Sequence, residues 1–352
     1  MKKKWICIAL IFVLVLAFSA CSKSEPADTG TEPPAEPSSE PVTLRMCTDY
    51  SAEDISGALV DEFAEKVNEQ TNGTVTIEVF HDGVLYKNDQ YADAISSGTL
   101  DMCYAMFGKG WPNTIPQFQA LGSGWFMSND EALNALNGPF GDYLAQLLEE
   151  KMNTKVLGWS GAGCVDVMLN NQHPITKPED LKGLKFRIAN AAQMAQVEAF
   201  GAVGVVMPPN DMYLGVQKGT IDGVYSTAPG GAMTIKLTEI AKYWTRVSVS
   251  GTGIEHGFVM NSDKYNALSK EQQDVLLALG KEYGQKMMDV TMEKGDEQWA
   301  HLEAQGIELT VIPAEDIPKW RAVWADAGDK VLKECVSEEE AQKLYDLAQQ
   351  SK

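Results

Sequence analysis

From residue 42 onward, short segments that alternate apolar and polar positions are separated by segments with helical periodicity. The segments form two successive series, and the second begins near residue 164. Strands separated by helices require right-handed crossovers and form mostly parallel sheets. The pattern therefore predicts an α/β fold with two lobes. The expected strands are 43–48, 74–80, 100–106, 155–159, 165–169, 184–188, 203–207, 220–226, 254–260 and 307–312.

The longest helical pattern runs from about Lys270 to Gln305 and contains glycines but no proline. Ser269 and Gln272 form a capping-box pair at its start. At 1.5 Å per residue, such a helix would extend roughly 50 Å. A continuous helix of this length could support both lobes, whereas a bend at a glycine would divide it in two.

Residues 181–223 contain the most informative local pattern, and Arg187 lies at its centre. The apolar positions of 184–188 alternate with charged ones, as in a strand with one buried face. Asn190 follows as a plausible N-cap of a helix over 191–200. Arg187 is therefore expected at the carboxyl end of a strand, beside a helix N-terminus. Ligands of open α/β sheets bind there, and both neighbours favour an anion. The sequence thus predicts that Arg187 binds a carboxylate.

The first residues have the pattern of an export signal. Residues 1–20 combine a basic start, an apolar core and small residues at the exit, which is typical of a signal peptide and too short for a membrane span. Cys21 follows directly and resembles the processing site of a bacterial lipoprotein, which implies lipid on its thiol; the alternative is an ordinary signal peptide. Residues 22–41 are rich in Ser, Glu, Pro, Thr and Ala and should form a disordered tether after Cys21.

Charge and cysteine content narrow the class of protein. A formal net charge of -20 argues against nucleic acid and against adhesion to anionic lipid, because both partners require basic patches. Cys47, Cys103, Cys164 and Cys335 lack metal-ligand spacing. We interpret them mainly as small buried residues, and whether any pair forms a disulfide stays open.

No sequence signature of catalysis is evident. His81, His173, His256 and His301 are far apart and are most simply loop or surface residues. The chain has no G-x-S-x-G elbow, P-loop or Cys-His signature. We therefore expect no catalytic residue, no metal and no cofactor.

Two motifs carry a family resemblance. LKGLKFRIANAA at 181–192 and GAVGVVMPPNDMYLGVQKGTIDGV at 201–224 resemble the solute-binding protein of tripartite ATP-independent periplasmic (TRAP) transporters, the DctP-like family. KLTEIAKY at 236–243 resembles the helix that follows the second-lobe crossover of that family. The resemblance implies two α/β lobes joined by crossing strands, a long helix behind both, and a cleft that closes on one small organic acid. It also implies a partner, a sodium-coupled membrane permease.

The resemblance also assigns roles to residues. Arg187 falls on the family's arginine that pairs with the substrate carboxylate, and Asn190 on a position that supports this site in some members. Sialic acid is disfavoured as a ligand for two reasons. Sialic-acid-type members of the family carry a further arginine near the positions 165–168, and this chain has none there. Those members also carry Glu-Asn-Pro soon after an Asp-Gly pair, and this chain does not have that sequence after Asp222 and Gly223. The expected lobes are 42–163 with 253–292, and 164–252 with 293–352.

Further candidate ligand-binding residues lie at the ends of strands that should face the same cleft. Loop or core packing is the alternative explanation for each of them. Lys109 could offer a second charge, although a solvated loop lysine is the better explanation. The other candidates are Tyr225, Ser226 and Thr227 from the second lobe, and Tyr50, Phe107 and Trp159 from the first.

Together these features predict an extracytoplasmic lipoprotein, periplasmic or on the outer cell surface, that captures an organic acid and delivers it to a permease. A ligand-sensing subunit of a membrane kinase or chemoreceptor is the alternative, and an enzyme on this fold is a third possibility. One arginine leaves monocarboxylates, dicarboxylates, keto acids and aromatic acids open as ligands.

Overall fold

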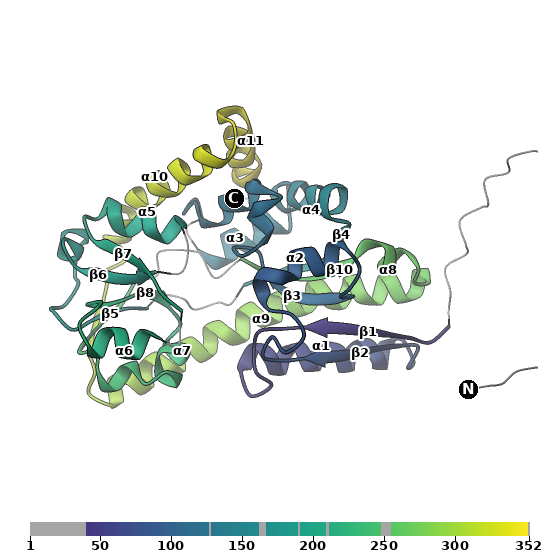
Figure 1. Cartoon of the computed structure of the whole chain (residues 1–352), viewed down its shortest axis with the longest axis horizontal. Helices are drawn as coiled ribbons and strands as arrows, with labels where there is room; N and C mark the ends of the chain where they lie inside the picture. The colour runs from purple at the N-terminus through teal and green to yellow at the C-terminus, as the bar shows by residue number, and fades with distance from the viewer. Residues whose placement is uncertain are drawn as a thin grey trace, which may run out of the picture. The chain divides into compact units, whose positions relative to one another are not determined.

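The computed structural model describes residues 40–126, 128–161, 167–188, 191–208, 211–247 and 255–350. The predicted signal peptide, Cys21 and nearly all of the tether lie outside the described residues. Within the described part, the strands form a five-stranded sheet of order β2-β1-β3-β10-β4 and a six-stranded sheet of order β11-β9-β5-β8-β6-β7 (Figure 1). The predicted two-lobed α/β fold is confirmed. No described helix is long and apolar enough to cross a membrane.

Each sheet is mostly parallel and contains one antiparallel strand. β10 runs antiparallel to β3 and β4, and β5 runs antiparallel to β8 and β9. β5 and β10 are the strands that follow the first two passages of the chain from one sheet to the other. β11 follows the third passage and pairs in parallel with β9. The strands are β1 (Val42–Cys47), β2 (Val75–Phe80), β3 (Met102–Met106), β4 (Thr154–Ser160), β5 (Val167–Asn170), β6 (Lys185–Ile188), β7 (Val203–Val206), β8 (Gly223–Thr227), β9 (Tyr243–Arg246), β10 (His256–Asn261) and β11 (Glu308–Val311).

Serine residues cap the beginnings of three helices, including the predicted cap Ser269. Ser128, Ser269 and Ser337 each accept a hydrogen bond from the backbone N–H three residues later. The α-helices are α1 (Ile55–Gln70), α2 (Asn88–Ser96), α3 (Asn129–Leu136), α4 (Pro139–Met152), α5 (Ala191–Ala199), α6 (Met212–Gln217), α7 (Pro229–Thr234), α8 (Ser262–Asn266), α9 (Lys270–Ala304), α10 (Ile317–Cys335) and α11 (Glu338–Gln349). The 3₁₀ helices are η1 (Trp111–Asn113), η2 (Pro116–Gly122), η3 (Pro178–Leu181) and η5 (Leu237–Glu239).

The segment 236–243 does not form the helix that the family resemblance implied. Lys236 adopts a left-handed conformation with φ 60°, and only the three residues of η5 follow before β9 begins at Tyr243. β9 was not predicted. It is four residues long and lies between β5 and β11, so its pairing rather than its own periodicity defines it.

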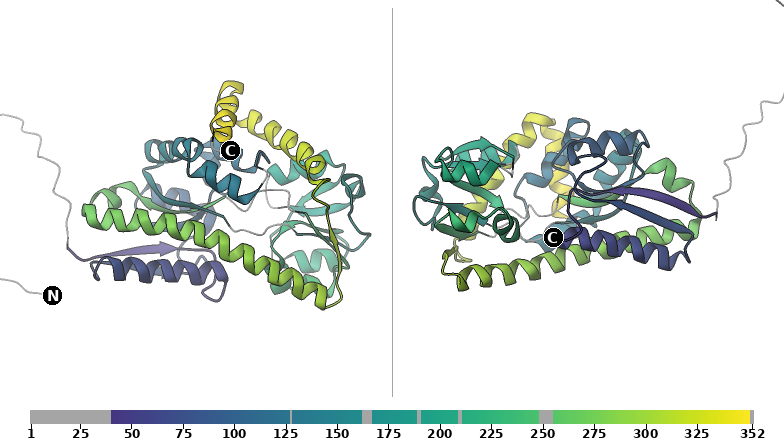
Figure 2. Two further views of the ribbon diagram at one scale, coloured as in Figure 1. Left: turned by 180° about the vertical axis from the view of Figure 1, so that it is seen from behind. Right: turned by 60° about the horizontal axis from the view of Figure 1, so that its bottom comes forward.

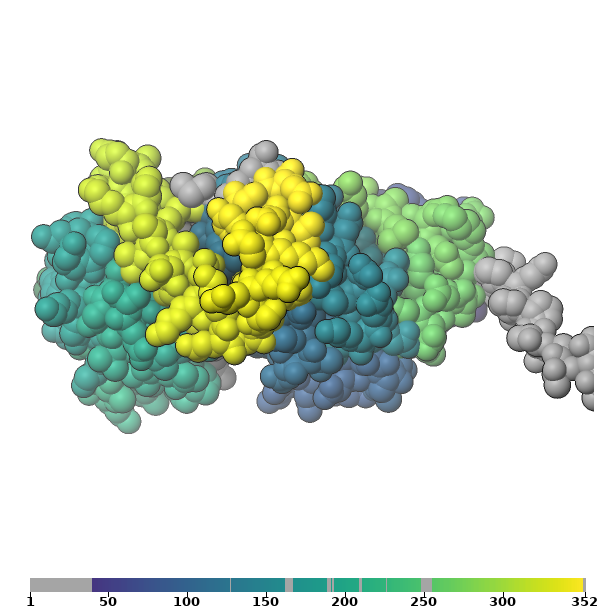
Figure 3. Space-filling view, turned by 90° about the horizontal axis from the view of Figure 1, so that it is seen from above, coloured from purple at the N-terminus to yellow at the C-terminus, as the bar shows by residue number. Residues whose placement is uncertain are grey.

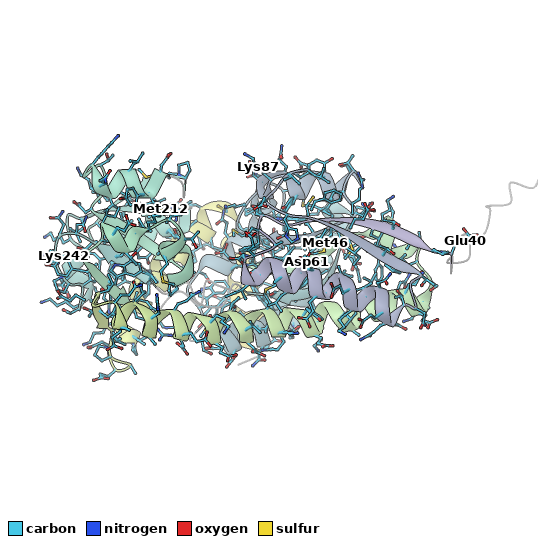
Figure 4. All side chains as sticks on the ribbon, turned by 90° about the horizontal axis from the view of Figure 1, so that it is seen from below. Glu40, Met46, Asp61, Lys87, Met212 and Lys242 are labelled. Carbon is cyan, nitrogen blue, oxygen red and sulfur yellow. The ribbon has the colours of Figure 1, made fainter. Side chains whose placement is uncertain are left out.

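Helix α9 is one uninterrupted helix of 35 residues, which confirms the predicted long helix. Leu276 and Met287 belong to the hydrophobic core of the first sheet. Trp299 and Leu302, further along, belong to that of the second. Figure 2 shows α9 running along both sheets, and Figure 4 shows Asp61 of the first lobe and Met212 of the second beside different parts of its length. Different parts of the apolar surface of α9 therefore pack against the two lobes, and the helix supports both.

Glycines allow α9 to lie directly against strand β4. A Cβ atom at Gly284 would lie 2.1 Å from the carbonyl oxygen of Trp159, and one at Gly158 would lie 2.0 Å from that of Gly280. Real Cβ atoms do not approach backbone atoms so closely. The close contact of helix and strand therefore requires glycine at these positions.

The C-terminal helices connect the lobes. Trp320 and Trp324 of α10 pack in the second lobe, whereas Leu332 of α10 and Leu344 and Ala348 of α11 join the core of the first (Figure 3). The expected division into lobes stays a prediction, but α11 does not follow it: 293–352 was assigned to the second lobe, and the buried face of α11 packs on α3, α4 and η2.

We expect Gly284→Ala to lower the free energy of unfolding by about 1–3 kcal/mol, because the added methyl group must push α9 away from β4. Urea unfolding would measure this change. Gly231→Ala in α7 is the matched control, since its Cβ would meet only the Thr227 hydroxyl at 3.8 Å and should be neutral or slightly stabilising. Equal stability of the two variants would contradict the close contact.

Candidate functional site

Arg187 lies on β6, between β7 and β8. The neighbouring Phe186 and Ile188 pack in the core of the second lobe, and this packing fixes the strand. Arg187 itself is buried, with 8 % of its surface exposed, and its Nε donates a hydrogen bond to the carbonyl of Met207 at 3.0 Å. The strand therefore holds the guanidinium at a defined position.

The charge of Arg187 is not balanced by an acidic side chain among the residues that the structure describes. Burial lowers the pKa of Arg187 to about 10, so the group is still a cation at neutral pH. Burying an ion without a partner costs free energy, which an incoming anion would recover. Arg187 thus has the properties expected of a carboxylate-binding residue.

A cavity of ≈ 140 Å³ opens at the same end of β6. Its second-lobe wall includes Ala191, the first residue of α5, which lies just beyond the end of β6. The other residues on its wall come from the first lobe or from the chain just before β10. The cavity is lined by Gly108, Gly110, Pro112, Asn113, Phe118, Gln119, Gly122, Ala191 and Glu255.

Glu255 is a charged residue of this cavity that the sequence did not predict. Its side chain is partly exposed, and its backbone carbonyl accepts a hydrogen bond from the N–H of Phe107 at 2.6 Å. A Cβ atom at position 108 would lie 2.0 Å from Oε2 of Glu255, so Gly108 makes room for the carboxyl group. Burial raises the pKa of Glu255 to about 7, while the charge of Lys109 lowers it. An acidic residue within the predicted strand 254–260 was the only available signal.

The predicted aromatic wall residues lie one layer behind the cavity. Phe107 and Trp159 are buried, with ring centroids 5.1 Å apart. Phe107 stacks on Phe118 at 4.9 Å, and Phe118 is the aromatic residue that lines the cavity. Packing in the core of the first lobe accounts for both residues, so a direct role in ligand contact stays a prediction. Lys109 is exposed.

Tyr50 belongs to a polar cluster inside the first lobe. Its hydroxyl lies 3.1 Å from Nε2 of His256, and Tyr104, whose ring stacks on His256, is hydrogen-bonded to Ser160 at 3.0 Å. Burial raises the pKa of Tyr50. The interpretation of His256 as a loop or surface residue was wrong, because it lies within β10 and is 4 % exposed. Contact of Tyr50 with a ligand stays a prediction.

The candidates from the second lobe differ in their placement. Tyr225 is 2 % exposed, and its hydroxyl donates to Oε1 of Gln196 at 3.2 Å inside the core. Thr227, which ends β8, is partly exposed. Asn190 and the side chain of Ser226 lie outside what the structure describes. Core packing thus explains Tyr225, and a cavity role for the other three stays a prediction.

The described cysteines are free thiols. Cys47 and Cys103 are register partners on β1 and β3, and both are buried. Burial raises the pKa of Cys47 to about 11 and that of Cys103 well above its usual value, which keeps both thiols protonated. They are small buried residues, as interpreted from the sequence. Cys335 is exposed, and Cys164 lies outside the described residues.

Glu255 should give stability a specific dependence on pH. Its pKa is raised from 4.5 to about 7 in the folded protein, so folding favours the protonated form. This contribution is fully present below pH 4.5 and is lost as pH rises through 7. We expect the stability of the wild type relative to Glu255→Gln to fall over this range, as measured by urea unfolding at pH 5 and pH 8. A constant difference between the two proteins would show that Glu255 titrates normally.

Comparison with known proteins adds to this geometry. Residues 47–335 match the family model DctP, described as bacterial extracellular solute-binding protein, family 7. The C4-dicarboxylate-binding periplasmic protein DctP of Rhodobacter capsulatus is 27 % identical over 268 residues, which are 70 % of this chain and 79 % of that protein.

Solved structures share the fold. A TRAP periplasmic solute-binding protein from Ochrobactrum anthropi has a TM-score of 0.79 at 23 % identity, covering 89 % of this chain and 96 % of that one. Another from Chromohalobacter salexigens, with bound D-glucuronate, has a TM-score of 0.74 at 21 % identity, covering 88 % and 100 %. At these identities the likeness shows a common fold.

Proposed function

Because this chain belongs to the bacterial extracellular solute-binding proteins of family 7, the DctP family, we propose that it captures a small organic acid through a carboxylate contact with Arg187. The family membership confirms the resemblance found in the sequence. Relatives supply the range of acids to consider: the Rhodobacter capsulatus protein is named for C4-dicarboxylates, and the Chromohalobacter salexigens structure holds D-glucuronate.

The buried, unneutralised charge of Arg187 is the observation that carries this proposal. Nε is already engaged by Met207. This contact fixes the plane of the guanidinium, and the terminal nitrogens can then receive a carboxylate side by side. Such a bidentate contact is stronger and more directional than the point contact of a lysine ammonium. The same contact is stronger in a dry cavity than in water.

Closure of the lobes would complete the binding site. The cavity takes its walls from both lobes, so a ligand that contacts both sides binds the closed state better than the open one. This difference in affinity is what can stabilise a closed state. α9, which supplies core residues to both lobes, would remain as the common support during this movement.

The closed, loaded form would then deliver its ligand to a partner in the membrane. We infer a TRAP-type sodium-coupled permease, because the solved structures of this fold include proteins described as TRAP solute-binding proteins. The Cys21 lipid would hold the protein at the membrane surface, and residues 22–41 would act as its tether. No covalent chemistry is needed for capture or release.

Arg187→Ala should weaken binding of the acid by about 10- to 100-fold, because a charge-assisted contact contributes roughly 1.5–3 kcal/mol. A thermal-shift screen of organic acids identifies the ligand, and titration calorimetry compares the variants. Arg187→Lys should fall between the wild type and Arg187→Ala, because it keeps the charge but loses the planar fork.

Arg45→Ala is the matched control for this experiment. Arg45 is an arginine of the first lobe that is about half exposed and lies near Asp101, with Nε 3.6 Å from Oδ2. Its removal should leave ligand affinity unchanged. If folded Arg187→Ala binds the acid as tightly as the wild type, the proposed site is wrong.

The proposed lipid anchor has its own test. In a bacterial host that processes lipoproteins, the wild type should incorporate labelled palmitate and remain in the membrane fraction, because lipid on Cys21 supplies its anchor. Cys21→Ser should lose the label and appear in the soluble fraction. A Cys335→Ser control should retain the label. Soluble, unlabelled wild-type protein would indicate an ordinary signal peptide instead.

A further inference from the structure

The described lining of the cavity includes an acidic group but not Arg187, which lies on β6 a few residues before the lining residue Ala191. Glu255 is the carboxylate among the described lining residues, and the rest of that lining is formed by glycine, proline, alanine, amide and aromatic residues. None of the described residues donates a hydrogen bond to its side chain. Gly108 leaves it the space that a larger residue would occupy. Glu255 is therefore available to accept hydrogen bonds from a ligand.

An ionised carboxylate discriminates between two classes of organic acid. It accepts hydrogen bonds from hydroxyl or ammonium groups, but it repels a second carboxylate. Lys109 lowers this repulsion only in part, because the lysine is exposed and its charge is screened by solvent. A diacid in this cavity would have to protonate one carboxyl group or keep its second group away from Glu255.

The remaining polar groups suit the same class of ligand. Asn113 and Gln119 line the cavity, and their amides can both donate and accept hydrogen bonds. Phe118 supplies an apolar surface on which the carbon skeleton of a ligand can lie. The volume of ≈ 140 Å³ is close to the roughly 150 Å³ of a cavity that accommodates benzene. The space therefore fits a small, compact molecule.

We propose that Glu255 is a specificity-determining residue that selects acids with hydroxyl groups, such as hydroxy acids and sugar acids, over dicarboxylates. This inference rests on the proposed function, since it assumes that Arg187 holds the first carboxylate. Glu255 then accepts hydrogen bonds from hydroxyls on the far side of the ligand. The amides of Asn113 and Gln119 complete the polar contacts around it.

Two pairs of probes of matched size test this proposal by calorimetry at pH 8, above the pKa of Glu255. Glycerate is compared with malonate, and D-glucuronate with adipate. The wild type should bind the hydroxylated member of at least one pair about 10-fold or more tightly than its dicarboxylate partner. Glu255→Gln should reduce this preference by about 10-fold or more, because it removes a charge-assisted hydrogen bond and the repulsion together.

Glu308→Gln is the matched control, because Glu308 is exposed on the edge strand β11 and outside the cavity. It should keep the wild-type preference. If Glu255→Gln folds poorly, Glu255→Asp takes its place: the charge remains, so dicarboxylates should still be disfavoured, while the shortened side chain should weaken binding of the hydroxylated acid.

The outcomes separate this inference from the proposed function. A wild-type preference for dicarboxylates, or a Glu255→Gln variant with unchanged preference, would overturn the role of Glu255, whereas the proposed function would stand if Arg187→Ala still weakens binding. If the wild type binds no organic acid, or if Arg187→Ala binds normally, the proposed function fails and this inference fails with it.

Discussion

A guanidinium that is buried at the end of a strand has lost most of its hydration, and the loss must be compensated. In this protein the backbone carbonyl of Met207 provides one contact to Arg187, and no described side chain provides a negative charge. The surrounding structure makes this arrangement tolerable, because β6 is fixed by the packing of Phe186 and Ile188 on either side of the arginine. The packing of the lobe thus holds a buried charge that an incoming anion would neutralise.

The position of Glu255 in the cavity depends on how the two sheets are connected. The chain passes between them and returns as β10, so that Glu255, immediately before β10, lies beside the loop that follows β3. α9 supports both lobes and lies directly on β4 through Gly158, Gly280 and Gly284. A support that contacts its strand without intervening side chains has little freedom to shift. Relative movement of the lobes is therefore more easily accommodated in the connecting segments than in the contact of helix and strand.

Sequence reasoning found the elements that depend on local pattern. Strand periodicity and serine caps located β6 and α9, and the position of Arg187 followed from a strand that ends beside a helix. Tyr225 shows where this reasoning stops: alternate residues of a strand face opposite sides, and the pattern of 220–226 did not show that Tyr225 faces the core and Gln196. Glu255 and Gln119 could not be found, because they lie far apart in the sequence and only the fold brings them to one cavity. β9 was missed for the same reason, as its four residues are defined by their neighbours.

A crystal structure of the protein with its tightest-binding acid would show whether Arg187 holds the ligand's carboxylate. We expect two parallel contacts between the guanidinium and the carboxylate, at about 2.7–2.9 Å, with Nε still donating to the carbonyl of Met207. An acid bound with its carboxylate on other residues, while Arg187 contacts only the protein, would show that Arg187 is not the carboxylate-binding residue.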